Sequence, residues 1–306
     1  MSMSAVVQRY ILVVSHAAQQ ATLEAAVEVC QQIQAQGATP VLRDLEVAAV
    51  ISHAPELANL LVLDKDVSVS KIECAIVVGG DGTILRAAEL LRGAAVPMLG
   101  VNLGHVGFLA ETERDTITDT VARVLAKDYD VEERSTLAVR VKVGTEVVFE
   151  TWALNEATVE KASRERMLEV IIEVDRRPLS SFGCDGVVMS TPTGSTAYSF
   201  SAGGPVVWPT VDAMILVPLS AHALFARPLV VGPDSIFAVE ILERRSGHGV
   251  LWCDGRRTRN LPPGARVVVN KSDTSVLLAR LHPEAFTDRL VEKFDLPVTG
   301  WRGPAA

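Results

Sequence analysis

The stretch IVVGGDGTILR, residues 76–86, decides the fold of this chain. Residues 76–78 form a short β-branched run, which is typical of a buried strand. The three glycines that follow permit the backbone angles of a tight turn and the close approach of an anion. Apolar residues then recur at helical spacing between positions 84 and 91, and Thr83 is placed to cap that helix. The stretch therefore predicts a strand, a glycine turn and a helix.

The predicted turn combines a phosphate site with a carboxylate. Backbone N–H groups at the start of a helix, with the helix dipole behind them, bind phosphate, and Gly80 and Gly82 would supply such amides. Asp81 would repel a phosphate, so it suits a metal ligand or a base that takes a proton from a hydroxyl group. Arg86 lies one turn further along the helix, where it faces either a phosphate or solvent. The stretch thus suggests phosphoryl transfer, with an ordinary tight turn and a solvated aspartate as the alternative.

The elements predicted around this stretch indicate a doubly wound α/β domain over residues 1–131. Residues 45–71 are ambiguous, with one short helix expected near 55–61, but elsewhere strands and helices alternate. The expected strands cover residues 10–15, 38–42, 76–78 and 96–101, and the expected helices cover 23–33, 84–91 and 116–126. Such alternation predicts a parallel sheet. Asp81 then lies just past the carboxyl end of a strand, where open sheets of this kind bind ligands.

After the charged segment 127–134, which we interpret as a linker, the pattern of apolar residues changes to a period of two. The expected strands cover residues 137–143, 147–153, 167–174, 186–189, 236–242, 250–253, 267–269 and 276–281. Because helical patterns are almost absent between them, residues 132–282 are predicted to form an all-β domain, a sandwich or a barrel. A helix over residues 283–295 follows, opened by Pro283, and its apolar side needs a partner surface. We expect it to pack back on the first domain.

Composition bounds the possible functions. The chain has 306 residues, 48% hydrophobic and 22% charged, as in an ordinary globular protein of about two domains. Its net charge of −8 disfavours nucleic acid and anionic membranes as partners. Four widely spaced cysteines without a Cys-x-x-Cys pair predict reduced thiols rather than a zinc site. The sequence shows no basic segment leading into an apolar one and no unbroken apolar span, so we expect a cytoplasmic protein with no membrane partner. We also expect no metal held by the protein itself.

Two further motifs offer hydrogen-bonding groups near strand ends. NLGHVGFL, residues 102–109, follows a strand and suits either a loop that faces the same site as Asp81 or a plain connection between domains. His105 within it is a candidate base, or a surface histidine. Asn155 and Glu156 end a strand and offer the donors and acceptors that a vicinal diol of a ribose requires, or else they form an exposed turn.

The stretch STPTGSTAYSFSAGGP, residues 190–205, is dense in hydroxyl groups and glycine, and it follows Asp185 and a short strand. Hydroxyls and backbone amides can bind a nucleotide by hydrogen bonds. The alternative is a flexible linker, but a proline, a tyrosine and a phenylalanine favour an ordered loop. The chain lacks Gly-x-x-x-x-Gly-Lys-Ser/Thr, which excludes a P-loop enzyme, and no Gly-x-Gly-x-x-Gly opens the first helix, which argues against an ordinary Rossmann dehydrogenase.

Taken together, these motifs resemble those of the NAD kinase family, in the same order along residues 72–255. The Gly-Gly-Asp-Gly turn alone is not specific, because diacylglycerol and sphingosine kinases and phosphofructokinases share it, but the run TPTGSTAY is highly specific. The resemblance implies an α/β domain followed by a β-sandwich. It implies that the adenosine ribose 2′-hydroxyl of NAD attacks the γ-phosphate of ATP, with Mg²⁺, to give NADP and ADP. It also implies a homodimer or homotetramer, and for some bacterial members inorganic polyphosphate as a donor.

The resemblance further implies roles for particular residues. Asp81 would accept the hydroxyl proton, with positioning supplying much of the effect, while Gly80 and Gly82 would offer amides to phosphate. Asn155 and Glu156 match residues that bind NAD, through ribose hydroxyls. The residues that match those around the adenine are Asp185, Thr196, Ala197, Tyr198, Ser199, Phe200 and Ser201.

Two positions depart from the family pattern. Gly183 stands where many members carry a basic residue, and Arg256 and Arg257 follow the Asp254-Gly255 pair where many carry glutamine or another polar residue. The arginine pair is placed to supply the missing positive charge.

Two rival functions stay open. The Asn-Glu pair and the lack of a membrane-facing helix speak against a lipid kinase of the same superfamily, and the intact aspartate of the glycine turn speaks against a non-catalytic NAD(P)-binding regulator.

Overall fold

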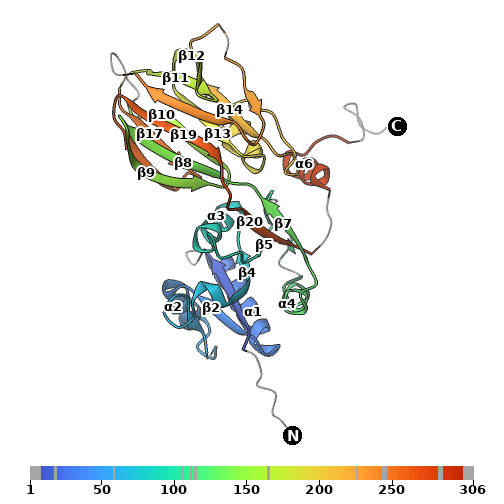
Figure 1. The fold of residues 1–306 in the computed structure, drawn as a ribbon. Coiled ribbons are helices and arrows are strands. Elements are labelled where there is room, and N and C mark those ends of the chain that lie inside the picture. The colour runs from blue at the N-terminus through green and yellow to red at the C-terminus, as the bar shows by residue number, and fades with distance from the viewer. Residues whose placement is uncertain are drawn as a thin grey trace, which may run out of the picture. The chain divides into compact units, whose positions relative to one another are not determined.

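The chain forms two compact units, which Figure 1 shows in colours that follow the sequence. The computed structural model describes residues 8–16, 19–57, 59–104, 107–110, 112–113, 116–163, 166–224, 226–242, 247–281 and 285–298. Unit 1 comprises residues 1–133 and 276–306, and unit 2 comprises residues 134–275. Unit 2 is therefore a continuous segment inserted into unit 1. No helix among the described residues is long and apolar enough to cross a membrane.

Unit 1 is built on a sheet with the strand order β3-β2-β1-β4-β5-β20-β7, and β6 also pairs with β5. Its strands are β1 (Tyr10–Ser15), β2 (Thr39–Leu42), β3 (Leu61–Val62), β4 (Ile72–Val78), β5 (Met98–Asn102), β6 (Thr112–Glu113), β7 (Asp130–Arg134) and β20 (Val276–Arg280). The central strand β4 pairs in parallel with both β1 and β5. It is buried over nearly its whole length, as expected for a parallel strand with both faces covered.

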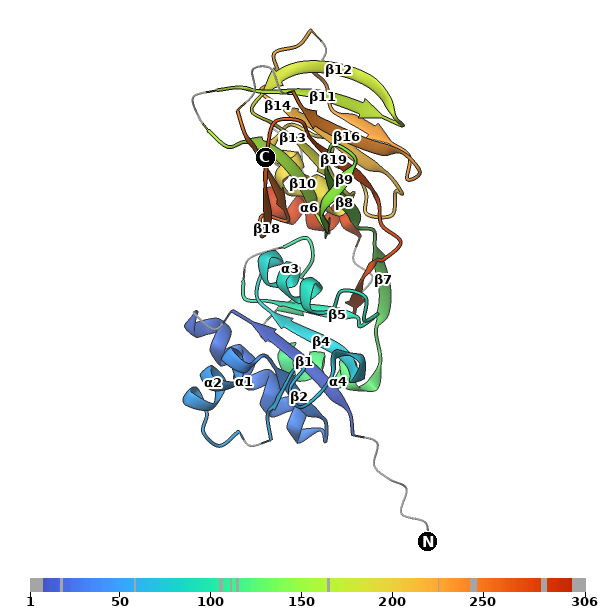
Figure 2. The same ribbon diagram turned by 60° about the vertical axis from the view of Figure 1, so that its left-hand side comes forward.

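Helices cover both faces of this sheet. The helices of unit 1 are α1 (Gln20–Ala35), α2 (Asp44–His53), α3 (Asp81–Leu90), α4 (Ile117–Ala126) and α6 (Phe286–Phe294), with the 3-10 turn η1 (Val69–Lys71). Helices α1 and α4 share one buried cluster with Leu99 on β5. The next residue on β5, Gly100, faces the other way, where an added Cβ would lie 2.7 Å from Ile84 Cδ1 on α3. Figure 2 shows α3 across the sheet from α1 and α4, so the predicted doubly wound arrangement is confirmed.

Unit 2 is a sandwich of two six-stranded antiparallel sheets, which confirms the predicted all-β architecture. One sheet has the order β15-β14-β13-β10-β17-β18, and the other has the order β12-β11-β16-β19-β8-β9. The strands are β8 (Leu137–Val143), β9 (Glu146–Ala153), β10 (Glu156–Lys161), β11 (Leu168–Val174), β12 (Arg177–Cys184), β13 (Gly186–Ser190), β14 (Met214–Leu219), β15 (Leu229–Val231), β16 (Ile236–Ile241), β17 (Gly249–Cys253), β18 (Arg257–Leu261) and β19 (Ala265–Lys271). Two short helical turns, η3 (Thr193–Thr196) and α5 (Tyr198–Ser201), follow β13.

The core of unit 2 lies between the two sheets. Val139 on β8, Val159 on β10, Phe237 on β16 and Val267 on β19 belong to one cluster of fully buried side chains. Because successive side chains of a strand point to opposite faces, residues 156, 158 and 160 of β10 point away from this core. The outer face of the first sheet therefore receives polar residues from β10.

Helix α2 and its surroundings differ from the prediction. A helix was expected near residues 55–61 in an otherwise ambiguous stretch, but α2 spans Asp44–His53. The helix ends before Pro55, because a proline disfavours helical geometry at the residue that precedes it. In contrast, the strand predicted over residues 10–15 is found as β1.

The boundaries between the two units also differ from the predicted 131/132 and 282. The supposed linker 127–134 contains strand β7, and the strand predicted at the end of the all-β domain is β20, which joins the sheet of unit 1. There Leu278 pairs in parallel with Met98 of β5. An alternating pattern predicts a strand but does not show which sheet the strand joins, because that choice depends on partners far away in the sequence. Helix α6 belongs to unit 1, and Pro283 lies outside the described residues.

The four cysteines, Cys30, Cys74, Cys184 and Cys253, are free and buried. Burial in apolar surroundings raises the pKa of each thiol to about 12, so they are inert packing residues. Over the part of the chain that the structure describes, no group of three or more histidine, cysteine, aspartate or glutamate side chains could hold a metal ion.

Candidate active site

The glycine turn between β4 and α3 carries the candidate phosphate-binding residues of unit 1. Gly79 has a φ of +143°, and an added Cβ there would lie 2.5 Å from Thr83 Oγ1, so glycine is required. Gly80 is the N-cap of α3, and Asp81 is its first residue. The expectation that Thr83 caps the helix is wrong, because the Thr83 N–H donates to the Gly80 carbonyl at 2.8 Å and Thr83 lies inside the first turn. Gly80 and Gly82 are exposed, which leaves the positive end of the helix dipole accessible to an anion.

The Asp81 carboxylate is held by the segment of residues 107–110. Its Oδ2 accepts a hydrogen bond from the Phe108 N–H and its Oδ1 accepts one from the Leu109 N–H, each at 3.1 Å. A Cβ on Gly107 would lie 2.4 Å from Asp81 Oδ1, so the absence of a side chain allows this close approach. The motif of residues 102–109 and the glycine turn therefore meet within unit 1. His105 lies outside the described residues.

In unit 2 the Asn155–Glu156 pair is fixed by a carboxylate from the turn between β17 and β18. Asp254 accepts hydrogen bonds from the backbone N–H groups of Leu154 at 2.9 Å, Asn155 at 2.7 Å and Glu156 at 3.3 Å. The Arg257 guanidinium lies 2.7 Å from the same carboxylate and offsets its charge. Arg257 therefore does supply a positive charge, but it supplies it to Asp254.

The stretch of residues 190–205 packs on the other side of the same pair. Thr191 Oγ1 donates to the Leu154 carbonyl at 2.6 Å, and the Thr191 N–H donates to the Asn155 carbonyl at 3.0 Å. An added Cβ on Gly194 would lie only 1.9 Å from the Asn155 carbonyl oxygen. Three sequence motifs, separated by up to a hundred residues, thus converge on the backbone of Leu154–Glu156.

Glu156 is a buried carboxyl group with an altered proton affinity. Burial, followed by the nearby Asp254 carboxylate, raises the pKa of Glu156 to about 7. Its Oε2 accepts a long hydrogen bond of 3.4 Å from the Tyr198 N–H. Partial burial and the negative charges of Glu160, Glu156 and Asp185 raise the pKa of Tyr198. The outer face of the sheet therefore gathers three acidic side chains around Tyr198.

Asp185 pairs with a lysine that the sequence reasoning did not single out. Lys161 Nζ lies 2.5 Å from Asp185 Oδ1, and this hydrogen bond lowers the pKa of Asp185. Of the other predicted nucleotide-binding residues, Tyr198 and Phe200 are 39% and 41% exposed. Ser199 is fully buried, so its hydroxyl does not reach the surface. The remaining members of the set are Thr196 and Ala197, which are half-buried, and Ser201, which is exposed.

The predicted site residues therefore form two groups, one in each unit. Unit 1 holds Gly80, Asp81 and Gly82 at the start of α3, with the half-buried Arg86 further along the helix. Unit 2 holds the residues around Asn155 and Glu156. The sequence reasoning missed Asp254, Lys161 and Glu160 as members of the second group. Glu160 could have been found, because it lies four residues from Glu156 on one strand and so shares its face.

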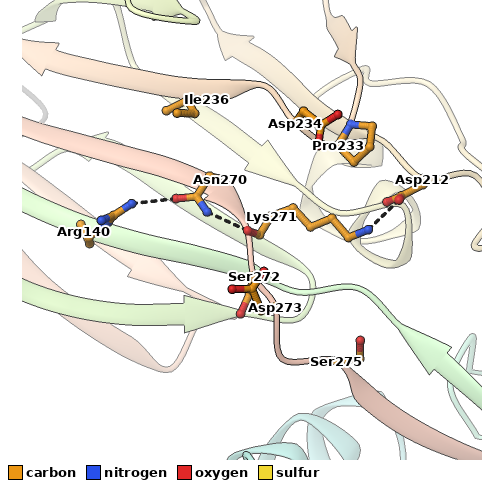
Figure 3. Close-up of a pocket in the computed structure, with 10 residues that line it drawn as sticks. All are labelled: Arg140, Asp212, Pro233, Asp234, Ile236, Asn270, Lys271, Ser272, Asp273 and Ser275. Atoms are coloured by element: carbon orange, nitrogen blue, oxygen red, sulfur yellow. Dashed lines mark hydrogen bonds and ion pairs between the residues drawn. The ribbon is translucent and has the colours of Figure 1, made fainter.

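A separate hollow of about 610 Å³ lies on the other sheet of unit 2, and none of the predicted site residues lines it. Figure 3 shows two contacts in it, in which Arg140 donates to Asn270 Oδ1 at 3.0 Å and Lys271 Nζ lies 2.5 Å from Asp212 Oδ2. Because three aspartates line the hollow against one arginine and one lysine, it does not resemble a phosphate site.

The fold and these two groups of residues define a class of enzyme, a phosphotransferase whose acceptor is an alcohol group. The chain matches the model of the ATP-NAD kinase N-terminal domain over residues 11–129 and that of the ATP-NAD kinase C-terminal domain over residues 154–281. An NAD kinase of Leifsonia xyli is 68% identical over 297 residues, which cover 97% of this chain and 98% of that protein. The chain belongs to the ATP-NAD kinase family.

Solved structures agree on the fold. Yeast NADH kinase, crystallised with NADH, superposes with a TM-score of 0.85 at 21% identity and covers 95% of this chain and 88% of its own. An NAD kinase from Archaeoglobus fulgidus, in complex with ATP, superposes with a TM-score of 0.70 at 23% identity and covers 94% of this chain and 99% of its own. Both unit 1 and unit 2 thus have counterparts in kinases of known structure.

Proposed function

We propose that this chain transfers the γ-phosphoryl group of ATP to the 2′-hydroxyl of the adenosine ribose of NAD, giving NADP and ADP. The observation that carries the proposal is the match of both family models, supported by relatives named NAD kinase along the whole chain. The structural neighbours were solved with NADH and with ATP. These comparisons do not favour a lipid kinase or a non-catalytic regulator.

In the proposed reaction Asp81 is the base. The ribose oxygen forms a bond to the γ-phosphorus, the bond from that phosphorus to the β,γ-bridging oxygen breaks, and the hydroxyl proton passes to Asp81. The two backbone hydrogen bonds to its carboxylate support this role, because they fix the position of the acceptor oxygens. Gly80 and Gly82 would offer amides to the phosphates, and Arg86 would add positive charge further along α3.

In unit 2, Asn155 and Glu156 would bind ribose hydroxyls, and Asp185 with the loop of residues 196–201 would surround the adenine. The fixed backbone of Leu154–Glu156 supports the first assignment, because a pre-positioned pair loses little entropy on binding. The exposed rings of Tyr198 and Phe200 support the second, since an aromatic face can stack on a base. Ser199 is fully buried and its carbonyl accepts from the Gly204 N–H at 2.8 Å, so in the proposal it shapes the loop rather than contacting the base.

We propose Mg²⁺ as the cofactor, bound to ATP when ATP binds. Magnesium is usually held by one or two carboxylates together with substrate phosphates rather than by an all-protein cage. Here the phosphates of ATP would hold the ion, because Asp81 is the base and its two oxygens accept the Phe108 and Leu109 N–H groups. The ion would neutralise charge on the phosphates, and the protein would orient the acceptor hydroxyl.

Location, assembly and a second donor are further parts of the proposal. Free, buried cysteines fit a reducing compartment, which supports the cytoplasm. Exposed apolar side chains on unit 2, among them Trp208, Val211 and Leu224, support a homodimer or homotetramer. Inorganic polyphosphate is a donor in the proposal as well, because a site built on backbone amides and a helix dipole recognises phosphate rather than adenosine.

A coupled assay tests the proposed reaction. Purified protein is incubated with NAD, ATP and Mg²⁺, and NADP is detected with an NADP-specific dehydrogenase. We expect NADP to form with ATP and to disappear when Mg²⁺ is chelated. Replacement of ATP by polyphosphate tests the second donor separately. If neither donor gives NADP although NAD binds, the chain is a binding protein and the proposal is wrong.

The raised pKa of Glu156 predicts that NAD binding depends on pH. A carboxyl group with a pKa of about 7 is mostly protonated at pH 6 and mostly ionised at pH 8. If the ionised form accepts hydrogen bonds from the ribose, affinity should rise by about tenfold from pH 6 to pH 8, because only the ionised fraction binds. Calorimetric titration with NAD measures this. Glu156→Gln should bind more weakly and without that pH dependence, and an equal slope in both proteins would contradict the prediction.

The raised pKa of Glu156 makes folding stability change with pH in the opposite direction to NAD affinity. Because the folded protein binds the proton more tightly than the unfolded chain, the stabilisation due to Glu156 is complete below the ordinary glutamate pKa of 4.5 and is lost as pH rises through about 7. Thus, as the pH rises towards 8, affinity for NAD increases while this residue stabilises the fold less.

A further inference from the structure

The segment of residues 107–110 is bonded on both sides, and only one side faces Asp81. On the other side, Arg289 Nη1 of α6 donates to the Phe108 carbonyl at 3.0 Å, and Arg280 Nη1 of β20 donates to the Leu109 carbonyl at 3.1 Å. Both arginines are less than 10% exposed. The two cations come from the last part of the chain, nearly two hundred residues after the glycine turn.

One peptide unit connects Arg289 directly to Asp81. The carbonyl of Phe108 and the N–H of Leu109 belong to the same planar peptide. That carbonyl accepts from Arg289, and that N–H donates to Asp81 Oδ1 at 3.1 Å. Because the two bonds lie at opposite ends of the peptide dipole, a cation at the carbonyl and a carboxylate at the N–H strengthen each other. The peptide formed by Phe108 and Leu109 is named the bridging peptide below.

Aromatic packing fixes the same peptide from the side of α6. The ring of Phe108 lies between two rings of that helix, with centroid distances of 5.9 Å to Phe286 and 5.8 Å to Phe294. Tilted pairs at these distances are attractive. Phe108 itself is 7% exposed, so its buried ring holds the Cα at one end of the bridging peptide against α6.

We propose that Arg289 is a positioning residue for the reaction, which holds the Asp81 carboxylate in place through the bridging peptide. This inference rests on the proposed role of Asp81 as the base. In this proposal helix α6 acts on Asp81 through the bridging peptide. A displacement of a catalytic group by about 1 Å can cost on the order of a hundredfold in rate. Loss of the Arg289 bond should therefore appear in kcat more than in the KM for either substrate.

Kinetics in two backgrounds test the proposal. Arg289→Met keeps the length of the side chain but removes its charge and donors, and kcat should fall by about 10- to 100-fold. Arg289→Lys should recover part of that loss, because one ammonium donor can reach a carbonyl. In the Asp81→Asn background, Arg289→Met should lower kcat by less than about threefold further, because the two residues act as a unit. A residue that only stabilises the fold would give the same fold-change in both backgrounds.

Amide hydrogen exchange gives a second readout that needs no activity. In Arg289→Met the Phe108 and Leu109 amides should exchange at least about tenfold faster than in the natural protein, while the amides of β4 keep their protection. Glu292→Gln, an exposed change on the same helix, is the matched control and should alter neither exchange nor kcat. If the amides of 108 and 109 stay protected in Arg289→Met, the inference is wrong whatever the kinetics show.

The two readouts separate this inference from the proposed function. If Asp81→Asn stays fully active while Arg289→Met speeds amide exchange, the anchoring of the segment stands and both the base role of Asp81 and the positioning role of Arg289 are lost. If Asp81→Asn is inactive and Arg289→Met leaves both exchange and kcat unchanged, the base stands and the positioning role of Arg289 is lost.

Discussion

Replacement of Asp81 by asparagine is expected to lower kcat by about 10²- to 10⁴-fold, the range that general base catalysis contributes. The amide cannot accept the hydroxyl proton. In the natural protein both carboxylate oxygens accept hydrogen bonds from the backbone N–H groups of Phe108 and Leu109. In the variant an NH₂ group replaces one of these oxygens. One of those amides would then face a donor rather than an acceptor, which costs about 1–3 kcal/mol for a buried group.

The coupled NADP assay measures this loss, and NAD binding by calorimetry serves as its control. The proposed NAD-binding residues Asn155, Glu156 and Asp185 belong to unit 2, so the affinity for NAD should change by less than about threefold. The large fall in kcat with nearly unchanged affinity is expected if Asp81 acts in the transition state. A kcat within fivefold of the natural value would remove Asp81 from the base role but leave the family assignment intact.

The substitution Gly194→Ala is expected to disrupt the candidate nucleotide-binding residues of unit 2. The added Cβ would lie 1.9 Å from the Asn155 carbonyl oxygen, 2.4 Å from its carbonyl carbon and 2.7 Å from its Cα. All three are backbone atoms, so no side-chain rotation relieves the contact. Either the turn η3 or the Asn155–Glu156 backbone must move, and overpacking of this kind costs about 1–3 kcal/mol or more.

Thermal unfolding and NAD titration measure the two consequences of Gly194→Ala. We expect a lower Tm and an NAD affinity weakened by at least about tenfold, since the bonds from Asp254 and Thr191 that align the pair cannot all survive a shift of the backbone. Gly232→Ala is the matched control, because an added Cβ there meets nothing within 4 Å. Equal melting and binding in both variants would show that the observed close packing is not required.

Much of the fold could be predicted from local pattern. The run at 76–78, the glycine turn and the helical spacing after it gave β4 and α3 in their true order, because each depends on residues close in sequence. The change to a period of two gave part of unit 2, namely β8, β9, β11, β13, β16, β17 and β19, for the same reason. The strands β10, β12, β14, β15 and β18 were not predicted. The prediction was wrong around α2, because the helix expected near residues 55–61 lies at Asp44–His53 and ends before Pro55.

The candidate site could be predicted less completely. Glycine turns, the Asn-Glu pair and the hydroxyl-rich loop are continuous motifs, and all of them were found. Asp254 was noticed only for the arginines that follow it, although its carboxylate is what aligns Asn155 and Glu156. Its role depends on β17 pairing with β10, and a pairing between strands so far apart in the chain is not visible in local sequence.

By itself, then, the sequence determined the two architectures and many of their elements, and it singled out the residues proposed for the chemistry, because these depend on short-range spacing and residue type. Only the tertiary structure decided that β20 joins the parallel sheet rather than the sandwich, and that Arg289 reaches the peptide beside Asp81. It also decided that burial beside Asp254 raises the pKa of Glu156. These features arise from contacts between distant segments, whose energies depend on distance and burial in space rather than on separation along the chain.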